Sequence, residues 1–75
     1  MQRCFISMTS LTYAQKAQKT LRKSGINTEI VRMPQKYAQN GCAFGLSFDH
    51  RQTAGHATYV LDMADIPYGK VILHE

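Results

Sequence analysis

The residue best suited to covalent chemistry is Cys42, which follows the Asn40-Gly41 pair and precedes an alternating apolar segment. The thiolate form of a cysteine is its nucleophile, and a nearby helix N-terminus or cation lowers the pKa of the thiol. Gly41 removes side-chain bulk beside the sulfur and leaves backbone N–H groups able to turn toward a ligand. A carrier thiol needs this access. The alternative is that Cys42 only fills space, because free cysteine is among the most buried residue types.

The other residues able to do chemistry are less favourably placed. Cys4 lies in an apolar segment, and we expect it to be a core residue. The three histidines, His50, His56 and His74, lack the 3 or 4 spacing that metal ligands on one helix face need, and we expect them on the surface. The sequence therefore predicts no metal site and no cofactor.

Turns that contain glycine or proline divide the chain into six predicted elements, four strands and two helices. Strands are predicted over 3–8, 26–33, 42–48 and 70–74, because apolar and polar residues alternate or cluster there. The first helix is predicted to begin after a cap at Thr9 or Ser10 and to end near residue 24. Asp49 with Gln52 resembles a capping box that starts the second helix, with a buried stripe of Ala54, Ala57, Leu61 and Ala64.

The order of these elements predicts one α+β domain over residues 1–75. It is that of a ferredoxin-like βαββαβ sandwich, in which a four-stranded antiparallel sheet of order 4-1-3-2 carries two helices on one face. Phe5 and Ile72 are expected on the open face, where an apolar patch favours a homodimer.

This topology places Cys42 beside the start of the first helix. The first strand ends at that edge of the sheet, and the third strand begins there. The unpaired N–H groups of a helix N-terminus stabilise an anion. We therefore predict an anion- or ligand-binding site around Cys42, made of Ser7, Thr9, Ser10, Arg32, Lys36 and Gly41.

The composition narrows the class of protein and of partner. The chain has 75 residues, a net charge of +4 and only two cysteines. We expect reduced thiols, a cytoplasmic protein without a membrane segment, and anionic partners. RNA binding is disfavoured, because the first and third strands lack an RNP-like cluster of exposed aromatic and basic residues.

The chain resembles the selenium/sulfur carrier-like family of small bacterial proteins. The resemblance rests on the Ser7-Met8-Thr9-Ser10 turn, the helix with Ala14, Ala17 and Leu21, the second strand from Gly25-Ile26 to Pro34, and the Gly41-Cys42-Ala43-Phe44-Gly45 segment. It implies that Cys42 carries sulfur or selenium as a persulfide or selenosulfide, exchanged with donor and acceptor proteins. The loop departs from the family, with Gln35, Lys36 and Tyr37 where relatives commonly have Arg and Ser.

Two other functions stay open at the level of the sequence. In the first, the chain is a non-catalytic interaction or ligand-sensing module and Cys42 is structural. In the second, the open sheet face binds RNA. A carrier or binding protein fits the sequence better than an enzyme with turnover.

Overall fold

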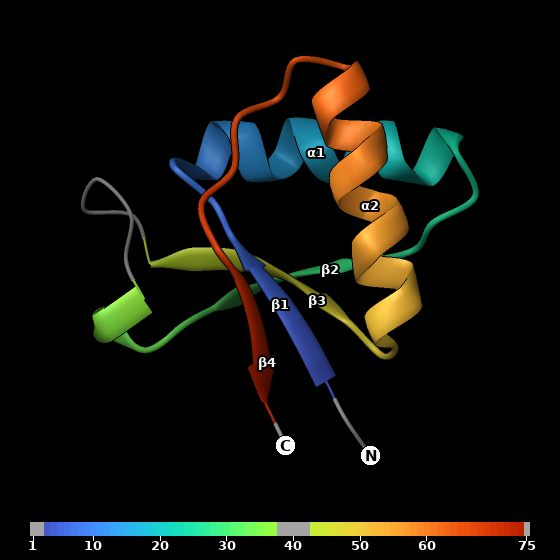
Figure 1. The fold of residues 1–75 in the computed structure, drawn as a ribbon. Helices are drawn as coiled ribbons and strands as arrows, with labels where there is room; N and C mark the ends of the chain where they lie inside the picture. The colour runs from blue at the N-terminus through green and yellow to red at the C-terminus, as the bar shows by residue number, and fades with distance from the viewer. Residues whose placement is uncertain (1–2, 38–42, 75) are drawn as a thin grey trace.

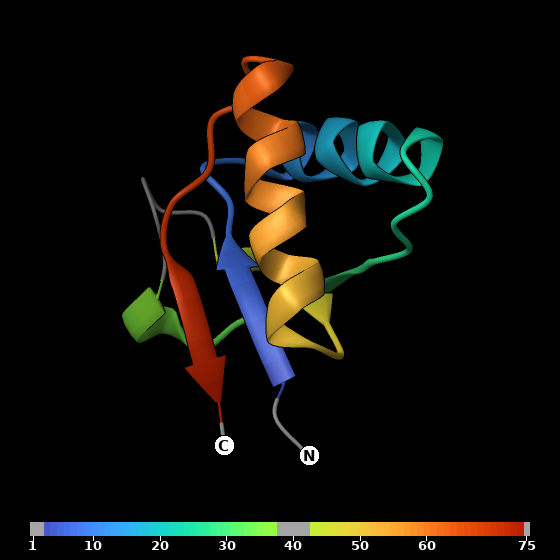
Figure 2. The same ribbon diagram turned by 45° about the vertical axis from the view of Figure 1, so that its right-hand side comes forward.

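A single four-stranded antiparallel sheet with two helices on one face forms the domain (Figures 1 and 2). The computed structural model describes residues 3–37 and 43–74, without the side chains of 37, 73 and 74. The elements follow in the order β1 (Arg3–Ser7), α1 (Leu11–Lys23), β2 (Glu29–Arg32), η1 (a 3-10 turn, Gln35–Tyr37), β3 (Phe44–Phe48), α2 (Arg51–Met63) and β4 (Val71–His74). The sheet order β2-β3-β1-β4 is the predicted one and is consistent with a ferredoxin-like sandwich.

Helix α1 begins as the sequence predicts. Ser10 is its N-cap in an extended conformation, and the Ser10 hydroxyl accepts a hydrogen bond of 3.1 Å from the Tyr13 N–H. This bond satisfies one of the free donors of the first turn. The helix stops before Gly25, whose φ of +81° is a conformation that glycine adopts without a Cβ penalty.

Helix α2 begins one residue later than predicted, and the predicted capping box is wrong. The N-cap is His50, with φ −134° and ψ 143°, and its side chain makes no capping hydrogen bond. The Asp49 carboxylate instead lies 3.9 Å from the Arg3 guanidinium. Ala54 and Leu61 are buried as expected, but Ala64 is exposed, because it is the C-cap and already lies past the last turn.

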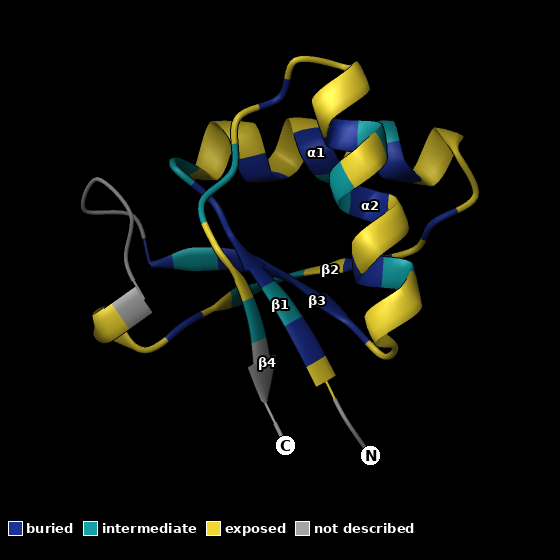
Figure 3. Cartoon of the chain, viewed as in Figure 1, coloured by how far each residue is buried: buried dark blue, intermediate teal, exposed yellow. Residues whose placement is uncertain are grey.

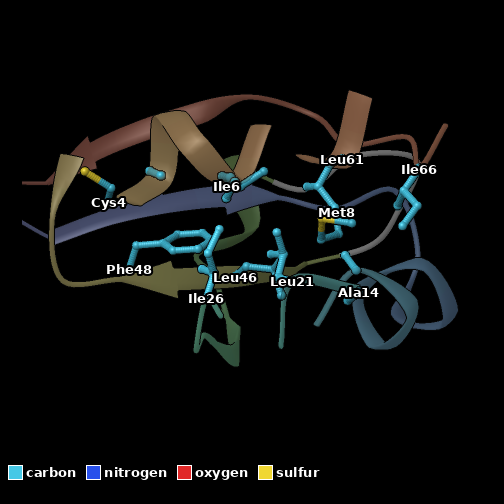
Figure 4. Close-up of a cluster of buried hydrophobic side chains, with 13 residues drawn as sticks. Cys4, Ile6, Met8, Ala14, Leu21, Ile26, Leu46, Phe48, Leu61 and Ile66 are labelled. Atoms are coloured by element: carbon cyan, nitrogen blue, oxygen red, sulfur yellow. The ribbon is translucent and has the colours of Figure 1, made fainter. Parts of the chain in front are cut away.

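The hydrophobic core lies between the sheet and the two helices (Figures 3 and 4). Cys4 and Ile6 of β1 and Leu46 and Phe48 of β3 face the helices, as their period-2 spacing predicts. The helices contribute mostly small residues to this interface: Ala14, Ala17, Ala54 and Ala57, with Leu21 and Leu61 as the larger members. Small side chains let the helices approach the sheet closely, so a short chain still has a continuous core.

On the opposite face of the sheet, the Met33 side chain packs closely against Gly45 of β3. Gly45 is buried there, and a Cβ built on it would overlap the Met33 Sδ and would lie 2.9 Å from the Ile6 carbonyl oxygen. Met33 follows the last residue of β2, so the absence of a side chain at Gly45 lets Met33 lie against the sheet. Glycine is thus required at this position for close approach.

Candidate functional site

The C-terminal ends of β1 and β2 and the start of β3 meet at one end of the sheet, where the sequence places the site. The Phe44 carbonyl accepts a hydrogen bond of 3.0 Å from the Met8 N–H, just past the end of β1. The Ala43 carbonyl accepts one from the Met33 N–H, just past the end of β2. The start of β3 is therefore held between the other two strands, close to the entry into α1.

Two of the predicted site residues, Cys42 and Gly41, lie outside the described residues. Ala43, which follows Cys42 in the sequence, is the first described residue after them and is buried. The predicted roles of Cys42 and Gly41 remain predictions.

Ser7 is at the predicted end of the sheet, but its hydroxyl is engaged by the backbone of Lys70, the residue just before β4. The Lys70 N–H donates to the Ser7 Oγ at 2.7 Å, and the same hydroxyl lies 3.4 Å from the Lys70 carbonyl oxygen as a donor. The Ser7 carbonyl accepts from the Gly69 N–H at 2.6 Å. Gly69 and Lys70, the two residues just before β4, thus both bond to Ser7 of β1, as in a β-bulge. Ser7 is 1% exposed, so we infer that its hydroxyl has a structural role.

Thr9 and Ser10 connect β1 to α1, and their side chains are half-buried. The Ser10 hydroxyl is engaged as the cap of the helix. The first turn of α1 carries no acidic residue, so no carboxylate of its own offsets the positive end of the helix dipole.

The two predicted cations, Arg32 and Lys36, are exposed and lie on the chain that leads toward the site. Arg32 ends β2 and is paired with Phe44 across the sheet. Lys36 lies in η1. The structure therefore places Ser7 at the end of β1, Thr9 and Ser10 in the link to α1, and Arg32 at the end of β2. Phe44 of β3 joins the ends of β1 and β2. Lys36 lies four residues after Arg32.

Cys4, His50 and His56 lie where the sequence predicts, Cys4 in the core and the two histidines on the surface. Cys4 is fully buried and free, at one end of the core cluster (Figure 4). His50 and His56 are exposed. Within 3–37 and 43–74, no three His, Cys, Asp or Glu residues are grouped as a metal site needs. No helix in those ranges has the length and apolarity to cross a membrane.

One titratable group was not singled out by the sequence. Burial raises the pKa of Tyr68 above 10.0, and a hydrogen bond to the Asp62 side chain and the negative charge of Asp62 raise it further. Tyr68 is half-buried and packs on the core. From its place in the Pro67-Tyr68-Gly69 turn, the sequence predicts only that Tyr68 lies in a loop. The contact between Tyr68 and Asp62 of α2 becomes visible only in the fold.

Comparison with known proteins identifies the family. No curated protein and no solved structure matches the chain. A family model described as "Putative Se/S carrier protein-like" matches residues 3–72, which is nearly the whole chain and includes the segment around Cys42. The chain belongs to this Se/S carrier protein-like family, as the resemblance of its sequence suggested.

Proposed function

We propose that this protein is a carrier of sulfur or selenium, and that the Cys42 thiol holds the transferred atom. The observation that carries the proposal is the family match over residues 3–72. Donor and acceptor proteins are the partners that a carrier requires.

The choice of Cys42 is supported by the position of the other cysteine. The sequence contains only Cys4 and Cys42. Cys4 is 0% exposed and belongs to the core cluster between sheet and helices. A donor protein has no path to that sulfur without unfolding of the domain. If a thiol of the folded chain takes up sulfur, it is the Cys42 thiol.

The surroundings of the adjoining residues favour a thiolate. Ala43 and Phe44 are bonded to the ends of β2 and β1, and α1 begins three residues after Met8. The first turn of α1 is free of acidic residues, and Arg32 lies opposite Phe44. Positive potential at this edge of the sheet lowers the pKa of a nearby thiol and stabilises a bound anion.

The reaction is a thiol exchange that needs no external oxidant or reductant. The Cys42 thiolate attacks the outer sulfur of a donor persulfide, R–S–SH, and a new S–S bond forms on Cys42. The donor S–S bond breaks, and its electron pair leaves with the donor as a thiolate, R–S⁻. The same exchange with a selenium donor leaves an S–Se bond on Cys42. Transfer to an acceptor thiolate reverses the step.

The test compares three proteins after incubation with sodium polysulfide: the wild type, Cys42→Ser and Cys4→Ala. Intact-mass spectrometry should show the mass of one added sulfur atom on the wild type and on Cys4→Ala, removed by a thiol reductant. Cys42→Ser should show none. Cys4→Ala is the matched control, since it removes the other thiol and leaves the candidate in place.

Equal sulfur uptake by Cys42→Ser and the wild type would contradict the proposal. Parallel incubation with selenodiglutathione distinguishes the two elements, because a selenium carrier should form the S–Se adduct on the same cysteine. Circular dichroism of each variant establishes that the domain is folded in the assay.

A further inference from the structure

We propose that one face of α1 is the surface on which an acidic protein partner docks, a partner that donates sulfur or selenium to the chain or accepts it. The inference rests on the proposed carrier function, because a carrier must bind its donor and its acceptor in turn. The α1 basic face is formed by four exposed cations: Lys16, Lys19, Arg22 and Lys23.

The four cations lie on one side of the helix. Each member of the α1 basic face is three or four residues from another member, which is the spacing at which side chains on a helix are neighbours. The buried residues Ala14, Ala17 and Leu21 occupy the other side and belong to the core cluster. The cations therefore form one continuous surface that faces away from the core.

This face carries the whole net charge of the protein. The chain has nine Lys and Arg residues and five Asp and Glu residues. Four of the nine cations are on α1, which has no acidic residue, so the remaining five balance the five acidic residues. Among residues 3–37 and 43–74, none of the four cations forms an ion pair with a carboxylate. An exposed face of a single sign attracts a partner of the opposite charge and speeds its association.

The stability of the helix does not explain these charges. Like charges three or four residues apart destabilise a helix, and α1 has no acidic residue to pair with them. The helix dipole favours only Arg22 and Lys23, because these two lie in the last turn. Lys16 and Lys19 lie in the middle of the helix without that compensation, so they are the residues that best test a docking role.

The composition of the face favours a protein over a nucleic acid or a membrane. Proteins that bind single-stranded nucleic acid stack the bases on aromatic side chains, and a helix that lies on a membrane inserts apolar ones. The exposed large apolar residues of α1, Leu11 and Tyr13, lie in its first turn, ahead of all four cations. Charge contacts without an apolar anchor are typical of the rim of a protein interface and of transient complexes, which suits a partner that leaves after transfer.

The face extends from the end of the sheet where the candidate site lies. Helix α1 begins three residues after Met8, whose N–H is bonded to Phe44 at the start of β3. A helix rises about 1.5 Å per residue, so Lys19 lies about 12 Å along the axis from Leu11. An interface of about 800 Å² per partner covers this length. A partner docked on the α1 basic face therefore also reaches the start of α1, beside the predicted site.

The test compares two synthetic peptides that carry a cysteine persulfide and differ only in charge. In one the cysteine is followed by glutamates and in the other by glutamines, over about six residues, which at about 3.3 Å each match the length of α1. Intact-mass spectrometry measures the rate of sulfur uptake. At an ionic strength of about 0.1 M the acidic peptide should react about fivefold faster. The difference should vanish at about 1 M, where the screening length falls from about 10 Å to about 3 Å.

Two double variants show whether α1 is responsible. Lys16→Gln/Lys19→Gln should remove most of the preference for the acidic peptide without loss of stability in urea unfolding, because the charges removed repel each other. The matched control, Arg51→Gln/Lys70→Gln, removes two exposed cations outside α1 and should keep the preference.

A binding measurement separates docking from sulfur transfer. The acidic peptide in its thiol form should shift the backbone amide signals of residues 16–23 in NMR spectra, in the wild type and equally in Cys42→Ser. If neither persulfide loads Cys42 while these signals still shift, the carrier proposal has failed and the acidic docking surface has not.

Three outcomes would overturn the proposal. The first is an equal rate with both peptides at low ionic strength. The second is an equal loss of preference in the two double variants, which would mean that only the net charge matters. The third is binding to duplex DNA or to phosphatidylglycerol vesicles that Lys16→Gln/Lys19→Gln abolishes while it keeps the preference for the acidic peptide, which would make a nucleic acid or a membrane the partner of this face.

Discussion

Replacement of Ser7 by alanine tests whether its hydroxyl holds the last strand in place. In the folded protein this hydroxyl accepts the Lys70 N–H at 2.7 Å, and the Ser7 carbonyl is already used by the Gly69 N–H. Ser7→Ala therefore leaves the Lys70 N–H without this acceptor, beside Ser7, which is 1% exposed. A partly buried donor that loses its partner costs about 1–3 kcal/mol.

The expected loss is measurable in a domain of this size. A change of about 1 kcal/mol moves the Tm of such a domain by roughly 4–8 °C. Urea unfolding of the wild type and Ser7→Ala should give the free-energy difference, and hydrogen exchange should show faster exchange at the Lys70 amide in the variant. The second measurement is local, so it separates the loss of this bond from a general loosening of the sheet.

Ser47→Ala is the matched control. Ser47 is also a buried serine of the sheet, but its backbone carbonyl, not its hydroxyl, accepts the hydrogen bond of 2.7 Å from Thr28. Alanine keeps that carbonyl, so we expect a smaller loss of stability than for Ser7→Ala. Equal stability of the two variants, with unchanged exchange at Lys70, would refute the structural role of the Ser7 hydroxyl and would make Ser7 a candidate for ligand binding again.

Two further predictions concern the open face and the turn before the last strand. Gly45→Ala should destabilise the fold by about 1–3 kcal/mol, because its Cβ overlaps the Met33 side chain. In urea unfolding, Met33→Ala should recover part of that loss in the Gly45→Ala background, and strict additivity of the two changes would contradict the proposed overlap. Asp62→Asn should lower the pKa of Tyr68 toward 10.0 without reaching it, because burial, the larger cause, remains. Tyrosine-selective NMR titration measures this, with Asp65→Asn as the control at a position whose φ of 57° asparagine tolerates. Since the pKa of Tyr68 is raised by folding, its stabilising contribution is complete below pH 10.0 and is lost as the pH rises through the raised value. An unchanged Tyr68 pKa in Asp62→Asn would contradict the assigned contact.

The sequence by itself determined the order of the elements and which faces are buried. Alternation in residues 3–8 and 44–48 placed Cys4, Ile6, Leu46 and Phe48 in the core, because side chains two apart on a strand share a face. The helix stripes of alanine and leucine were equally readable except at Ala64, and the sequence narrowed the cap of the first helix to Thr9 or Ser10, of which the structure shows Ser10. These features depend on near neighbours in the chain, and the family resemblance, carried by motifs of the same kind, was confirmed.

Only the tertiary structure decided what depends on residues far apart in the chain. Ser7 was predicted to contribute to a ligand site, yet its hydroxyl accepts the N–H of Lys70, 63 residues away, because Gly69 and Lys70 both bond to Ser7 just before β4 begins. Asp49 was predicted to cap α2, yet it lies beside Arg3. The close approach of Met33 to Gly45 likewise depends on how β2 pairs with β3. Patterns of neighbouring residues do not specify such contacts. The register of the strands, and with it the partner that each polar side chain finds, is set only when the strands pair.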